Sequence, residues 1–170
     1  MNLLNHPVPD EHLKHIGDIT VSFALLESII QMVVGSFIAE HQRVGQIITA
    51  ELAFKNLRAL LISLYLERHG EDTDYTHLKD FMKRIADIEA RRNQITHSIW
   101  GAGSEAGSIT RIKTTAKERH GIRFQFEDIK ANDLENIATE IKQLATELQI
   151  FWLHLLESGK VINNPSEKLW

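Results

Sequence analysis

The sequence contains no cysteine among its 170 residues. This absence excludes disulfides, thiolate zinc sites, iron–sulfur clusters and cysteine nucleophiles, and a reducing compartment is the simplest location for such a chain. We therefore expect a cytoplasmic protein. The sequence also lacks an excess of positive charge, since 19 Lys and Arg residues face 23 Asp and Glu residues, for a net charge of −4. Nucleic-acid binding must then depend on a local basic patch.

The N-terminal segment lacks a cationic stretch followed by an apolar run, so we expect no secretory signal there. Residues 19–39 have the length and apolarity of a membrane span, but Glu27 lies at the middle and Gln31 follows one turn later. A carboxylate at mid-bilayer costs roughly 2.5–3.5 kcal/mol on insertion scales. We interpret this segment as a buried helix of a soluble bundle and expect no membrane partner.

Motifs of the common cofactor classes are missing as well. No Glu has a His three residues later, as di-iron bundles require, and neither a Walker sequence nor a nucleophile elbow is present. His12 and His15 are spaced at i and i+3, but no third zinc ligand is evident. We expect neither a metal nor a cofactor.

Four segments have helical patterns, at about 16–39, 44–68, 76–100 and 131–156. Two β-branched or aromatic stretches at 109–114 and 122–126 predict a β-hairpin. The sequence therefore predicts an all-α fold, an antiparallel four-helix bundle with a small β-hairpin (about 108–126) inserted before the last long helix. This helical domain would occupy 16–157, between an N-terminal extension (1–15) and a C-terminal tail (158–170).

An arginine interrupts the apolar seam of the third predicted helix. The seam consists of Leu78, Phe81, Ile85, Ile88, Ile95 and Ile99, and its gap falls at Arg92. Burying an unpaired guanidinium costs folding free energy on the order of several kcal/mol. Arg92 therefore needs a carboxylate, a dimer partner, a water-filled cleft or a bound anion. Alternatively, its stem packs while its head reaches solvent. Glu27 is the expected carboxylate, either as a structural pair or to hold Arg92 in place.

A polar face lies beside this seam, because Glu89, Asn93 and His97 recur every four residues. Asn93 can then orient the His97 ring, and Glu89 can reach Asn93 or Arg92. An imidazole exchanges protons near neutral pH, and a guanidinium binds phosphate. Together they suit phosphodiester cleavage without a metal. For His97 alone, a structural histidine at a helix end is the simpler interpretation.

The run Arg92-Asn93-Gln94-Ile95-Thr96-His97 resembles the R-x4-6-H motif of the HEPN superfamily, with the polar residue that commonly follows the Arg. The resemblance implies a HEPN-like domain and a homodimeric, metal-independent endoribonuclease of the toxin or defence type. Arg92 would stabilise charge on the scissile phosphate, His97 would act as general acid or base for attack by the RNA 2′-hydroxyl, and Asn93 would orient it. Both subunits would contribute to one site. Arg91 would contact the RNA backbone.

The predicted hairpin supplies a local basic patch. Residues 108–123 contain five cationic residues and one acid, Glu118, for a net charge of +4. The rest of the chain therefore has a net charge of −8. These expected RNA-binding residues are Arg111, Lys113, Lys117, Arg119 and Arg123. A solvated hairpin edge that discourages aggregation is an equal alternative.

A second functional class also fits the sequence. A non-catalytic helical protein, such as an immunity protein, an antitoxin or a scaffold, would use the same bundle to bind a protein partner (an antitoxin or a toxin) or a nucleotide. The overall acidity favours this alternative, because a protein that neutralises a basic nuclease is usually acidic.

Overall fold

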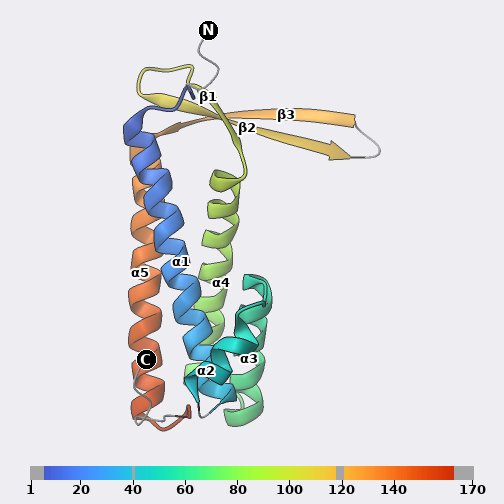
Figure 1. Cartoon of the computed structure of the whole chain (residues 1–170), viewed down its shortest axis with the longest axis vertical. Coiled ribbons are helices and arrows are strands. Elements are labelled where there is room, and N and C mark those ends of the chain that lie inside the picture. The colour runs from blue at the N-terminus through green and yellow to red at the C-terminus, as the bar shows by residue number, and fades with distance from the viewer. Residues whose placement is uncertain (1–5, 40, 118–120, 163–170) are drawn as a thin grey trace. The chain divides into compact units, whose positions relative to one another are not determined.

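The computed structural model describes residues 6–39, 41–117 and 121–162. Over these ranges the chain forms five helices and three strands in the order α1, α2, α3, α4, β1, β2, β3, α5 (Figure 1). Backbone contacts divide the chain into two compact units. Unit 1 comprises Met1–Ser22 and Ile88–Ile141, and unit 2 comprises Phe23–Asp87 and Lys142–Trp170. Helices α1, α4 and α5 contribute residues to both units.

The helices follow the apolar periodicity of the sequence. Their bounds are Asp10–Ile38 for α1, Gln42–Thr49 for α2, Phe54–His69 for α3, Thr73–Thr96 for α4 and Ala131–Glu157 for α5. Acidic residues occupy the first turn of α1, as the helix dipole favours. Helix α3 ends at His69, and the cap residue Gly70, with a φ of 72°, donates its backbone N–H to the Leu66 carbonyl oxygen at 2.9 Å.

The strands β1 (Ile99–Ala102), β2 (Ser108–Lys117) and β3 (Gly121–Lys130) form one antiparallel sheet in the order β1-β2-β3. Ile112 on β2 pairs with Ile99 on one side and with Phe126 on the other. Figure 1 shows β2 and β3 side by side as a long ribbon. The edge strand β3 is exposed from Gly121 to Asp128.

The all-α four-helix interpretation is wrong, because the fold is mixed, although mostly helical. The difference begins where α4 ends at Thr96, since Ile99 and Trp100 belong to β1 and do not continue the helix. The Trp100 indole N–H donates to the Ile95 carbonyl oxygen at 3.2 Å, which satisfies a free acceptor of the last helical turn. A β-branched and an aromatic residue then pair with β2, as such side chains prefer.

The helix expected at 44–68 is two helices, α2 and α3. The intervening residues 50–53 contain neither Gly nor Pro, so the sequence gives no local sign of this break. Within unit 2, α2 approaches α1 where Gly45 faces Gly35. Helix α1 also starts earlier than expected, at Asp10, within residues assigned to an N-terminal extension.

Each unit has its own apolar core. In unit 1 the buried side chains include Ile19, Ile88, Ile95, Ile109, Leu134, Ile137 and Ile141. In unit 2 they include Phe23, Leu57, Leu61, Tyr65, Leu78, Ile85, Leu144 and Leu148. Helix α1 is also long and apolar enough to cross a membrane, a test that the core helix of a soluble protein passes equally.

Candidate functional site

A cavity in unit 1 lies where the end of α4 meets the sheet. It has a volume of about 380 Å³. One side is formed by residues at the end of α4 and the start of β1, and the other by residues of β2. The lining residues are Asn93, Gln94, His97, Ser98, Ile99, Arg111, Ile112, Lys113 and Thr114. Four of the residues expected at a functional site, Asn93, His97, Arg111 and Lys113, are therefore brought together here.

His97 lies directly after the last residue of α4. Its backbone N–H donates to the Asn93 carbonyl oxygen at 3.1 Å, which fixes its position, while its side chain is exposed. The expected side-chain bond from Asn93 to the imidazole is not found among the described residues. His97 is thus an exposed residue of the cavity lining.

Arg92 acts on this cavity through its neighbour. Its guanidinium donates to the Asn93 side-chain oxygen at 2.8 Å, so Asn93 is oriented by Arg92 and not by His97. Arg92 is half-buried, and the cavity lining includes Asn93 but not Arg92. A charged donor fixes an amide more firmly than a neutral one does. The predicted residues Arg92, Asn93 and His97 are thus connected in sequence and in space.

Arg111 contributes to the cavity lining from β2. Its side chain is 12% exposed and ion-paired with Glu127 on β3. It also donates to the Gln94 side-chain oxygen at 2.9 Å, which joins β2 to α4. Lys113, two residues further along β2, is exposed. The cavity therefore has one cation held by partners and one extended into solvent.

The remaining predicted residues lie around this site or outside it. Arg91 forms an ion pair with Glu140 on α5, and Glu89 is half-buried on α4. Glu27 belongs to unit 2 and Arg92 to unit 1, so their ion pair stays a prediction. Arg123 is exposed on β3 opposite Thr115. Arg119 and the Lys117 side chain lie outside the described residues.

The lining residues that the sequence did not predict are Gln94, Ser98, Ile99, Ile112 and Thr114. Gln94 stands inside the Arg92–His97 run, so its position was a usable signal. Ile99 and Ile112 become neighbours only through strand pairing, which the sequence does not specify locally.

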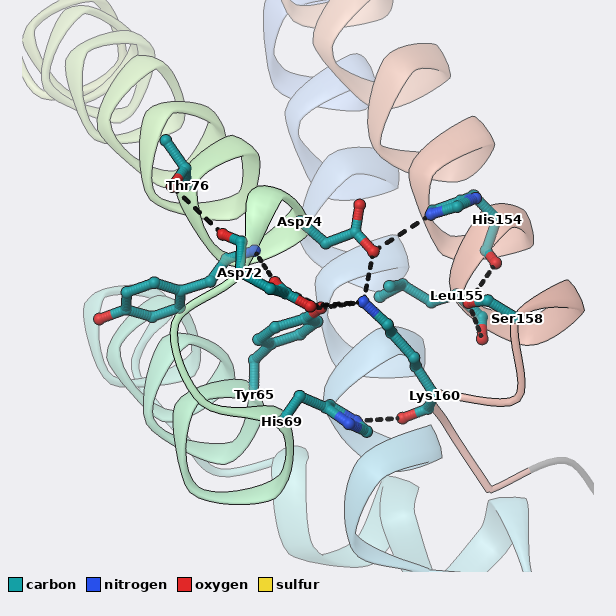
Figure 2. A network of polar contacts seen from close by, with 10 residues as sticks. Tyr65, His69, Asp72, Asp74, Thr76, His154, Leu155, Ser158 and Lys160 are labelled. Carbon is teal, nitrogen blue, oxygen red and sulfur yellow. Dashed lines mark hydrogen bonds and ion pairs between the residues drawn. The ribbon is translucent and has the colours of Figure 1, made fainter.

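A second polar cluster lies in unit 2 and joins the residues after α5 to the connection between α3 and α4. Figure 2 shows the Lys160 side chain pointing at the carboxylates of Asp72 and Asp74, each 2.6 Å from its ammonium nitrogen. The same nitrogen is 2.8 Å from the hydroxyl oxygen of Tyr65, whose ring is fully buried. The Lys160 carbonyl oxygen lies 2.7 Å from the His69 ring.

The charges of this cluster are mutually stabilised. The hydrogen bond from Lys160, followed by that from the Tyr75 backbone N–H, lowers the pKa of the Asp72 carboxyl to about 2. Burial opposes the charge of Lys160, but hydrogen bonds to Asp72, Asp74 and Tyr65 together raise the pKa of its ammonium. A lysine held protonated in this way cannot act as a base. The cluster therefore has a structural role and fastens the residues after α5 to the start of α4.

The described part of the chain contains no group of three or more His, Asp or Glu side chains that could hold a metal ion. His12 and His15, the pair spaced at i and i+3, are both buried near the start of α1.

The chain matches no protein-family model, and no curated protein or solved structure is significantly similar to it.

Proposed function

We propose that the protein is a metal-independent endoribonuclease of the HEPN toxin or defence type, acting in the cytoplasm as a homodimer. The observation that carries this proposal is the cavity shared by the exposed His97 imidazole and the cations Arg111 and Lys113. Its volume of about 380 Å³ suits a small ligand group. An imidazole beside cations is what RNA transesterification requires, because a proton must move while a phosphate gains charge.

In the proposed reaction, His97 removes the proton from a ribose 2′-hydroxyl. The 2′-oxygen attacks the adjacent phosphorus, the bond from phosphorus to the 5′-oxygen breaks, and a 2′,3′-cyclic phosphate forms. The leaving 5′-oxygen takes a proton from a general acid. Among the described residues that line the cavity, His97 is the one histidine, so we assign the acid to the same residue of a second copy. Arg92, which does not line the cavity, would hold Asn93 in place, and the exposed Lys113 would stabilise the phosphate charge.

The test is cleavage of an unstructured RNA in EDTA by wild-type protein and by His97→Ala. We expect the substitution to reduce the rate by about 10²–10⁴-fold, the usual contribution of a general acid or base. His77→Ala is the matched control, because His77 is also an exposed histidine of α4 and belongs to unit 2. Products should end in a 2′,3′-cyclic phosphate.

Three results would contradict the nuclease proposal. Equal cleavage by wild type and His97→Ala would show that a contaminating nuclease produces it. Absence of cleavage by pure wild-type protein, with no increase when metal is added, would exclude the nuclease. A monomer in light scattering at the assay concentration would exclude a shared site.

A non-catalytic role as an immunity, antitoxin or scaffold protein is the second candidate. The charge outside residues 108–123 favours it, since −8 there suits a basic protein partner. This candidate predicts no cleavage by the purified protein at any protein concentration.

A further inference from the structure

The outer edge of β3 is a long strand edge without the usual protection. β3 is the last strand in the order β1-β2-β3, and its residues 121–128 are exposed. Its register with β2 is unbroken from Ser108–Lys130 to Lys117–Gly121, so it has no bulge, and it contains no proline. An edge strand offers a row of backbone N–H and C=O groups, and proteins commonly shorten, bulge or cover such a strand to prevent pairing with another chain.

Charged residues also guard strand edges, but those of β3 are arranged to attract a copy of the same strand. Arg123 and Glu127 lie at equal distances on either side of Gln125, and the alternation of side chains places all three on one face. Antiparallel pairing of two β3 strands about a two-fold axis at Gln125 places each Arg123 opposite Glu127 of the partner subunit. Opposite charges at directly opposed positions stabilise a strand pair.

The Glu127 carboxylate can accept this second guanidinium. Arg111 of its own chain contacts the Oε2 atom, and the Glu127 side chain is 56% exposed. The Oε1 atom can therefore accept a hydrogen bond from an arginine on the other side of β3. Arg123 is exposed as well, so neither side chain has to leave a buried position to form the pair.

The neighbouring two-fold registers lack this match. An axis at Phe124 places Arg123 opposite Gln125. An axis at Phe126 places Arg123 opposite Ile129. The axis at Gln125 also places each Phe124 opposite the partner subunit's Phe126, and paired aromatic side chains stabilise antiparallel strands. This self-complementarity specifies a second copy of the chain as the partner, because an unrelated strand has no such relation to β3.

We propose that the protein self-associates through β3, and that two copies join their sheets in the order β1-β2-β3-β3-β2-β1 about a two-fold axis at Gln125. This inference does not rest on the proposed nuclease function. Three strand spacings, about 14 Å, separate β2 of one copy from β2 of the other, and each His97 cavity is lined by its own β2. A site that shares His97 of two copies therefore needs a different contact, to which the β3 contact is additional.

Because the chain has no cysteine, a single introduced one tests the register by disulfide formation. In Gln125→Cys the two side chains meet at the axis, where opposite Cα atoms are about 4.5–5.5 Å apart, within the range of a disulfide. Ile122→Cys is the matched control, because Ile122 is exposed on the same strand and its two copies lie about 20 Å apart in this register. On non-reducing gels we expect Gln125→Cys to cross-link at least about tenfold faster under mild oxidation.

Charge reversal tests the same register without a covalent bond. Arg123→Glu places acids opposite each other, and Glu127→Arg places arginines opposite each other. Each variant alone should raise the dissociation constant of the β3 contact at least about tenfold in analytical ultracentrifugation. An equimolar mixture should associate again, because every acid then faces an arginine. Circular dichroism checks the fold of both variants, since Glu127→Arg also removes the ion pair with Arg111.

Two results would overturn the proposal. One is equal cross-linking of Gln125→Cys and Ile122→Cys, a test that leaves the charged residues intact. The other is a mixture of the two folded charge variants that associates no better than either variant alone. The two proposals fail separately. A protein that cross-links through Gln125→Cys but cleaves no RNA refutes the nuclease alone, whereas one that cleaves RNA without this cross-link refutes the strand pairing alone.

Discussion

Arg111 on β2 donates a hydrogen bond to Gln94 on α4 across 2.9 Å. Both residues line the cavity that contains His97, so this bond joins its two sides. Arg111 is held from a third element by its ion pair with Glu127 on β3. The shape of the candidate site therefore depends on the sheet as much as on the helix that carries the Arg92–His97 run.

Gln94→Ala removes this bond and leaves Arg111 with Glu127 as a remaining partner. We expect the free energy of unfolding in urea to fall by about 0.5–1.5 kcal/mol, the net value of one such hydrogen bond. RNA cleavage should fall several-fold, because the cavity wall loosens while His97 stays in place. Gln149→Ala, at an exposed glutamine of α5, is the control. Identical unfolding curves for the two variants would mean that the Gln94–Arg111 bond contributes no stability.

Arg92→Lys keeps the positive charge at position 92 and removes the planar guanidinium that bonds Asn93. We expect cleavage to slow by about 10²-fold, a typical loss for one positioned donor. Arg84→Lys is the matched control, because Arg84 is another arginine of α4 and pairs with Glu147. Its ion pair survives the change, so its cleavage rate should match that of the wild type. Equal rates for both variants would remove Arg92 from the site.

Elements that depend on local periodicity could be predicted from the sequence, whereas elements that depend on long-range strand pairing could not. The last long helix was expected at 131–156 and is observed at Ala131–Glu157, because its apolar residues recur every three or four positions without interruption. Ile99 was assigned to a helix seam since the same spacing reaches it, yet pairing with Ile112 makes it a strand residue. Local periodicity cannot reveal a partner that lies further along the chain.

The candidate site was likewise predictable only in part. Asn93 lies in α4 and His97 lies directly after its last residue, so their four-residue spacing was enough to predict that they lie close together. Strand pairing of β2 places Arg111 in the cavity lining, whereas the sequence predicted this residue only as one member of a basic patch. The exposure of Phe124 and Phe126 was not predicted, because aromatic residues in a strand pattern are usually expected to be half-buried.

The contact between α1 and α2 in unit 2 gives a prediction about stability. A methyl group added at Gly45 would lie 2.8 Å from the Gly35 Cα, whereas one added at Gly35 would lie 3.6 Å from the Gly45 Cα. The Gly35 Cα is a backbone atom, so it can move away from a new methyl group only if a helix moves. Gly45→Ala should therefore destabilise the protein by about 1–3 kcal/mol. Gly35→Ala makes ordinary contact and gains helix propensity, so it should be neutral or stabilising by up to about 1 kcal/mol. Urea unfolding of the two variants compares them, and the reverse order would show that α2 does not pack against α1 here.

The Lys160 cluster predicts how stability changes in acid. The pKa of Asp72 is about 2 in the folded protein and 3.8 as its ordinary value. A carboxyl with a lowered folded pKa stabilises the fold above its unfolded pKa, and this contribution disappears as the pH falls toward the folded pKa. The free energy of unfolding of the wild type should therefore fall more steeply between about pH 4 and about pH 2 than that of Asp72→Asn. Asp80→Asn, at an exposed carboxylate of α4, should follow the wild-type curve. Parallel curves for wild type and Asp72→Asn would show that Lys160 does not hold the Asp72 carboxylate in solution.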